Sequence, residues 1–124
     1  MEEAFRAALL AYNGLTALVG TRIDWGERAG QLPSIRLLLV SGVPLYTYGG
    51  RVSLTPYRVQ ADCFGARYGV AKAVARAVQG ACDTLSRPVW DACFVEAERD
   101  DQERDAGGTL VHRTSLDLRL WHHS

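Results

Sequence analysis

The sequence has no excess of charge of either sign. Its 14 Lys and Arg side chains balance 14 Asp and Glu side chains, so the formal net charge of the 124 residues is zero. Nucleic-acid-binding proteins usually have a strong basic excess, and a polybasic membrane anchor needs a cluster of positive charge. The balance argues against both classes, and it leaves little electrostatic repulsion to oppose self-association.

Long apolar runs and cysteine pairs are also missing. A membrane-spanning helix needs about 18 apolar residues, whereas Arg36 interrupts the most apolar run, Ile35 to Val40. The Met-Glu-Glu start lacks the basic region of a secretory signal. The cysteines are Cys63, Cys82 and Cys93, without a C-x-x-C pair. They predict reduced core thiols in a protein made inside the cell, not a disulfide frame or a zinc site.

Hydrophobic periodicity predicts a single α+β domain over residues 1–124. We expect a mostly antiparallel sheet of four to five strands, one long helix packed on one face of the sheet, and an N-terminal helix. The expected helices cover residues 2–19, with a break at Asn13-Gly14, and 66–85; the expected strands cover residues 22–25, 34–40, 57–64, 90–98 and 109–121.

The strand expected over residues 57–64 has two different faces. Alternate residues from Tyr57 to Cys63 are apolar or small, and the period of two directs them to one side of the sheet. Arg58, Gln60 and Asp62 lie between them and share the other face. We expect this second face to be exposed to solvent or to contact a partner, so these three residues are interface candidates.

The long helix has a flank with almost no side-chain bulk. Gly69, Ala73, Ala77 and Gly80 recur along it at helical spacing. Such a flank lets another backbone approach closely, from this chain or from a neighbour, so Ala73 and Ala77 are also interface candidates. The alternative is that alanine is simply the strongest helix former.

Two segments are expected to be long connections. Glycine and proline in residues 41–56 predict a long loop or a loose hairpin tip. Residues 99–108 predict a charged, flexible connection, which is either solvated or docked on the Arg-bearing surface of a neighbour. The contact candidates are Tyr46, Tyr48 and Arg51 in the first segment, and Arg99, Asp100, Asp101, Arg104 and Asp105 in the second.

The sequence contains no recognisable catalytic or metal-binding pattern. His112, Ser115 and Asp117 do not form a hydrolase triad, because His112 and Ser115 point to opposite faces of one strand and no G-x-S-x-G motif is present. The adjacent pair His122-His123 would chelate poorly for the same geometric reason. We expect no enzyme activity, no cofactor and no metal.

The order of short motifs along the chain is more specific than any single motif. After an acidic N-terminal helix come LVGTRIDW at 18–25, Leu-Pro at 32–33 before an apolar strand, RVQADCFG at 58–65, an Ala-rich helix, EAERD at 96–100 and RTSLDLRLW at 113–121. With this order the chain resembles, from about residue 2 to 121, the tail completion (tail terminator) proteins of long-tailed phages, prophages and gene transfer agents.

The resemblance implies a structural protein with no catalytic residue. Members of the family form a ring, usually of six copies, that caps the head-proximal end of the tail tube, stops its polymerisation and offers a surface to the neck. The implied partners are other copies of the chain, the tail tube protein and a neck or stopper protein. DNA would only pass through the lumen, where acidic side chains of residues 99–108 are candidates for the lining, and no membrane is involved. The expected location is the tail and neck region of the virion, after assembly in the cytoplasm of the bacterial host.

Two alternatives stay open. The first is another neck component, such as a stopper or an adaptor, although adaptors are usually dominated by helices. The second is a small α+β enzyme or ligand-binding domain with residues 41–56 as a lid. That interpretation needs polar groups that converge inside an apolar pocket, and the sequence supplies no such set.

Overall fold

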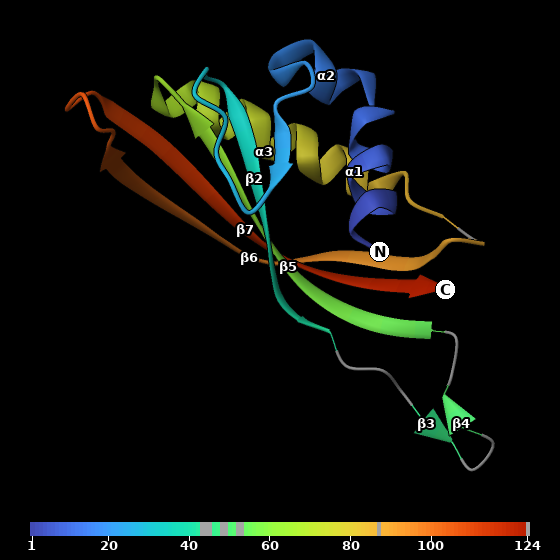
Figure 1. Ribbon diagram of the computed structural model, residues 1–124. Coiled ribbons are helices and arrows are strands. Elements are labelled where there is room, and N and C mark those ends of the chain that lie inside the picture. Colours follow the sequence, from blue (N-terminus) through green and yellow to red (C-terminus); the bar gives the residue numbers. More distant parts are fainter. Residues whose placement is uncertain (43–45, 48–49, 52–53, 87, 124) are drawn as a thin grey trace.

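A computed structural model describes residues 1–42, 46–47, 50–51, 54–86 and 88–123 (Figure 1). The helices are α1 (Glu2–Leu10), α2 (Asn13–Val19) and α3 (Tyr68–Asp83). The strands are β1 (Ile23–Trp25), β2 (Ser34–Gly42), β3 (Tyr46–Thr47), β4 (Gly50–Arg51), β5 (Leu54–Gly65), β6 (Trp90–Arg104) and β7 (Leu110–His123). No helix in these ranges is long and apolar enough to cross a membrane.

Five of the strands form a mixed sheet in the order β1-β2-β5-β7-β6. The last four strands alternate in direction, but β1 runs parallel to β2, with Ile23 beside Ile35. The predicted α+β class is therefore confirmed, while the mostly antiparallel arrangement is right only in part. After β1 the chain turns back and enters β2 in the same direction, and the Gly26 N–H donates to the Leu37 carbonyl oxygen at 2.8 Å. A three-residue strand has too little alternation to reveal this direction from sequence.

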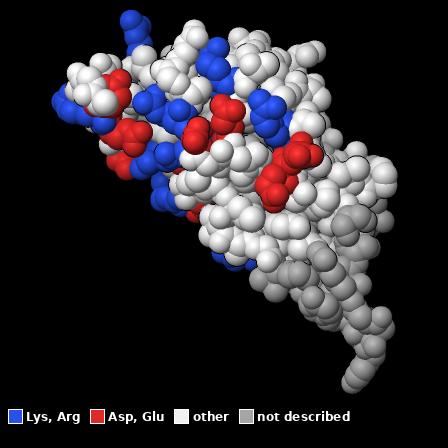
Figure 2. Space-filling view, viewed as in Figure 1, with Lys and Arg blue, Asp and Glu red and all other residues white. Residues whose placement is uncertain are grey.

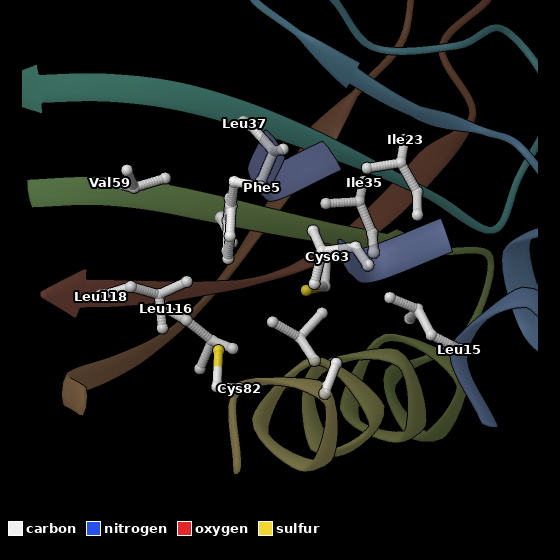
Figure 3. Packing of buried hydrophobic residues seen from close by; sticks show 14 of the residues in the cluster. Phe5, Leu15, Ile23, Ile35, Leu37, Val59, Cys63, Cys82, Leu116 and Leu118 are labelled. Carbon is white, nitrogen blue, oxygen red and sulfur yellow. The ribbon is translucent and has the colours of Figure 1, made fainter. Parts of the chain in front are cut away.

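The three helices lie on one face of the sheet (Figure 1). The predicted apolar stripe of α3 is buried from Ala71 to Cys82. Phe5 of α1 and Leu15 of α2 are fully buried in the same core as sheet residues such as Leu37 and Ile23 (Figure 3). Within the described part of the chain, no helix covers the opposite face of the sheet, which we call the open face.

The N-terminal helical segment is broken close to the predicted position, at Ala11 and Tyr12 rather than at Asn13-Gly14, which lie within α2. It forms two short helices, and α2 begins at Asn13. Gly20 ends α2 with a φ of 60°, in the left-handed region that glycine adopts without a steric penalty. The N-terminal segment therefore forms two short helices, as the predicted break implied, and both lie on the helix-covered face of the sheet (Figure 1).

The described part of segment 41–56 contains a short hairpin, in agreement with the second of the two predicted forms, a loose hairpin tip. β2 continues to Gly42 and β5 starts at Leu54, while the short strands β3 and β4 pair with Tyr46 opposite Arg51. Figure 1 shows this hairpin projecting away from the helices. Tyr48 lies outside the described residues.

The prediction of a flexible connection over residues 99–108 is wrong for most of its length. Residues up to Arg104 belong to β6 and pair with β7. Only a tight turn remains, in which Asp105 Oδ1 accepts from the backbone N–H groups of Gly107 and Thr109, each at 3.0 Å. The local sequence is polar because both faces of this ribbon lie beyond the core, not because the backbone is unpaired.

Candidate functional site

The open face of the sheet carries alternating charges. Arg99 binds the Asp117 carboxylate, and Arg113 lies 2.7 Å from a carboxylate oxygen of Asp101. Glu96 lies 3.1 Å from Arg119 and joins the same surface. Figure 2 shows, on one side of the molecule, positive and negative side chains intermixed from the end with the β6–β7 turn to the middle of the view. The surface therefore has local ion pairs without a field of one sign.

A shallow hollow of about 280 Å³ lies among these charges. Arg58 forms one side of it, 3.9 Å from Glu96, and is more than half exposed. Its charged groups are engaged with one another, so they do not converge on a common point as a catalytic or ligand site would require. The lining residues are Val40, Arg58, Val59, Gln60, Glu96, Arg99, Asp117 and Leu118.

Asp62 differs from the expectation of a wet face, because its side chain is fully buried. Its carboxylate accepts from Arg36 Nη2 at 2.7 Å, from Gln60 Nε2 at 2.8 Å and from Ser115 Oγ at 2.7 Å. Burial raises the pKa of Asp62, but the hydrogen bonds from Ser115, Gln60 and Arg36 together hold it below its ordinary value. Asp62 thus joins strands β2, β5 and β7 from within, and it is not available as an interface residue. Arg58, by contrast, is exposed as predicted, and Gln60 is half-buried.

The acidic residues predicted in a docking loop are used inside the ribbon. Asp100 is 2.8 Å from Lys72 Nζ and accepts from the Tyr68 hydroxyl at 3.0 Å, which ties β6 to the start of α3. The hydrogen bond from Lys72 is the largest cause of the lowered pKa of Asp100. Asp105 holds the turn, and Arg104 donates to the Gly108 carbonyl oxygen at 2.8 Å. Residues 99–108 therefore do not form the free acidic loop that was a candidate for the lumen lining.

The small flank of α3 is partly used within the chain. A Cβ atom at Gly80 would lie 2.6 Å from the Tyr12 hydroxyl, so Tyr12 packs closely over this glycine. Ala77 is half-buried against the core, whereas Ala73 is exposed and nothing lies within 4 Å of a Cβ built at Gly69. Only the N-terminal half of the flank is open to a neighbouring molecule.

Exposed apolar side chains on the two outer parts of the sheet were not predicted from the sequence. Leu39 and Val40 are 47% and 61% exposed at the end of β2, and Phe94 and Val95 are 55% and 38% exposed on β6. Two sequence features could have predicted this exposure. Residues 37–40 are all apolar, and residues 94–95 are an adjacent apolar pair, so each strand must place apolar side chains on both of its faces. Neighbouring exposed apolar side chains of this kind are typical of interaction surfaces.

The described residues offer little reactive chemistry. No three His, Cys, Asp or Glu side chains among them are grouped to hold a metal ion. Burial raises the pKa of the Cys63 thiol, which suppresses the thiolate form. Cys82 is buried as well.

Comparison with known proteins decides the family. The model of the family described as "Tail completion protein gp17" matches residues 3–123. The chain belongs to this family. It is therefore a structural protein of a phage-type tail, with its place in the tail and neck region of the virion. The predicted resemblance is confirmed, and membership in a family of structural proteins indicates a protein that is not an enzyme.

A solved structure from a gene transfer agent shows a similar fold. A chain of the virion of a native gene transfer agent particle is 23% identical with a TM-score of 0.67, and the match covers 100% of this chain and 95% of that one. Two structures of Akkermansia muciniphila proteins match with TM-scores of 0.40 and 0.35, at 13% and 16% identity. They cover 72% and 70% of this chain and 42% and 44% of their own lengths. No curated protein matches.

Proposed function

We propose that this tail completion protein caps the head-proximal end of a tail tube as a ring, with six copies as the expected number, and joins the tube to the neck. The family match over residues 3–123 supports the tail role. The observation that carries the ring is the shape of the sheet. Its open face has no helix among the described residues. The β6–β7 ribbon of the sheet extends past the helices at one end, and the separate β3–β4 hairpin projects away from the helices at the other (Figure 1).

Such a sheet favours contact with neighbours on several sides. A ring requires a heterologous contact, in which one patch meets a different patch on the next copy. The open face, the outer strands and the two extensions are chemically distinct, so one copy can meet its ring neighbours, the tube and the neck at the same time. We assign the β3–β4 hairpin, with Tyr46 and Arg51, to the contacts along the tail axis, because it projects furthest from the core.

Deletion of the gene in a producing strain tests the capping function. Without the protein, electron micrographs should show tails of irregular and excess length that are not joined to heads, because nothing stops tube growth. A plasmid copy should restore uniform, joined particles. Tails of normal length on filled heads in the deletion strain would refute the proposal.

The mass of the purified protein gives a second test. A species near six times 13.6 kDa in light scattering would show that the ring forms without the tube. A monomer would place ring formation on the tube tip and would leave the deletion experiment to decide. A compact dimer with a buried two-fold axis would contradict a head-to-tail ring.

A further inference from the structure

Both outer parts of the sheet leave backbone without a neighbouring strand. β6, which has 15 residues, is the last strand in the order, and among the described residues it pairs with β7 alone. On the other side, β1 covers β2 only from Ile35 to Leu37. Among the described residues, the stretch 38–42 of β2 therefore pairs with β5 alone. Such edges present free N–H and C=O groups that can form a ladder with any strand that reaches them.

The exposed apolar pairs of the two edges lie at the same level of the sheet. Leu39 is opposite Val59 on β5, Val59 is opposite Leu118 on β7, and Leu118 is opposite Val95 on β6. The irregularities in register also coincide, between Leu39 and Ser41 on one edge and between Val95 and Ala97 on the other. A neighbour placed beside the sheet without a shift along the strands would bring Val95 of one copy next to Leu39 of the other.

The two edges differ in the charge of their own residues, although acids of β6 such as Asp100 and Asp101 already pair with Lys72 and Arg113 inside the chain. β6 contains six acidic and two basic residues, a net charge of −4, whereas the β1–β2 side over residues 22–42 has three Arg and two acidic residues, a net charge of +1. Asp101, in the acidic part of β6, is opposite Arg113 on β7. Arg113 is opposite Phe64 on β5, and Phe64 is opposite Ser34 on β2, so Asp101 and Ser34 lie at the same height along the strands. Arg22, one residue before β1, adjoins this level on the basic edge. In a neighbour without shift, the acidic end of β6 would therefore meet the arginine-bearing end of the β1–β2 side.

We propose that β6 of one copy adds to residues 38–42 of β2 in the next copy, so that the sheets of successive copies join edge to edge around the ring. Within the chain β6 is antiparallel to β2, because three antiparallel pairings separate them. Copies related by rotation about an axis along the strands therefore form an antiparallel ladder, which is the more stable kind. The two edges differ, so the contact repeats in one direction until the ring closes. This inference rests on the proposed ring function and names the surface that builds it.

Disulfide cross-linking in assembled tail particles tests the pairing. The test chain carries Leu39→Cys and Val95→Cys, with Cys93→Ser to remove the native half-buried thiol of β6. Within one chain, positions 39 and 95 are separated by three strand spacings, about 14 Å, and a disulfide requires Cα atoms within about 7 Å. Every disulfide between them must therefore join two copies. Oxidised particles should give a ladder of dimers and higher multimers, while a control with Leu18→Cys on α2 in place of Leu39→Cys should stay monomeric.

A charge-exchange series separates pairing from simple damage to the fold. Val95→Lys alone and Leu39→Lys alone should each lower the yield of finished particles at least tenfold, because a charge on an edge opposes strand addition. Leu18→Lys, at a similarly exposed site away from the edges, should leave the yield unchanged. The double variant Val95→Lys with Leu39→Glu should recover most of the yield, since the Lys of one copy would meet the Glu of the next.

The outcomes distinguish this inference from the ring function itself. Rings without the cross-linked ladder, or a double variant no better than the Val95→Lys single, would overturn the edge pairing and leave the ring in place. Failure of the ring function would instead appear in the deletion strain, as tails of normal length joined to heads.

Discussion

The buried carboxylate of Asp62 makes the sharpest stability prediction. Replacement by alanine removes the acceptor of three donors and leaves Arg36 without its partner. Loss of one member of a buried ion pair typically costs 3–5 kcal/mol. Because the Arg36 side chain is one-quarter exposed and can regain water on that side, we expect the lower end, about 3 kcal/mol of the free energy of unfolding.

Asp117→Ala is the matched control. Asp117 accepts from Arg99 on the same face of the sheet, but both side chains are at least one-third exposed. Exposed pairs contribute between about 0 and 1 kcal/mol. Urea denaturation followed by circular dichroism measures both variants against the parent chain. Equal losses, or an Asp62→Ala loss below about 1 kcal/mol, would refute the assignment of Asp62 as the internal tie between β2, β5 and β7.

The same carboxylate predicts a pH dependence with a definite sign. The pKa of Asp62 is lowered in the folded protein, so its contribution is complete above the unfolded pKa of about 3.9 and is lost as the pH falls through the folded value. Asp62→Asn should flatten the stability profile below about pH 4. An unchanged slope in this variant would contradict the inferred charge state.

Three further predictions concern packing around α3. Gly65→Ala should cost about 1–3 kcal/mol of the free energy of unfolding, because the new Cβ would lie 2.7 Å from the backbone nitrogen of Ala71. Gly69→Ala is the control: its Cβ would meet nothing within 4 Å, so this variant should be neutral or slightly stabilising in thermal melts. Phe5→Ala should cost about 3–5 kcal/mol in urea denaturation, since this side chain is fully buried beneath the sheet; a loss below 1 kcal/mol would contradict the core as described. Lys72→Met removes the ties to Asp100 and Glu98, and should speed hydrogen exchange in residues 98–103 of β6 while the β5 amides keep their protection; uniform acceleration would show a global effect instead.

Local patterns predicted most elements because each has its own period. The strand from Tyr57 to Phe64 alternates with a period of two, and α3 repeats its apolar residues every three to four positions. These periods depend only on which face of an element is buried. The motif order likewise indicated the tail completion family before any contact was known.

Predictions failed where the decisive partner is distant in sequence. The alternation of its own strand predicts that Asp62 is exposed to solvent. In the structure, its carboxylate instead binds Ser115, which is 53 positions away in sequence, and Arg36, which is 26 positions away. The charged composition of residues 99–104 predicts a loop, but these residues pair with β7 and form a strand. No local pattern records either partner.

The sequence by itself determined most element types, the balanced net charge and the family. The tertiary structure alone decided the direction of β1, the burial of Asp62 and the register that aligns Leu39 on β2 with Val95 on β6. The physical reason is that propensity and periodicity act over a few residues, whereas strand order and register depend on which segments meet in space.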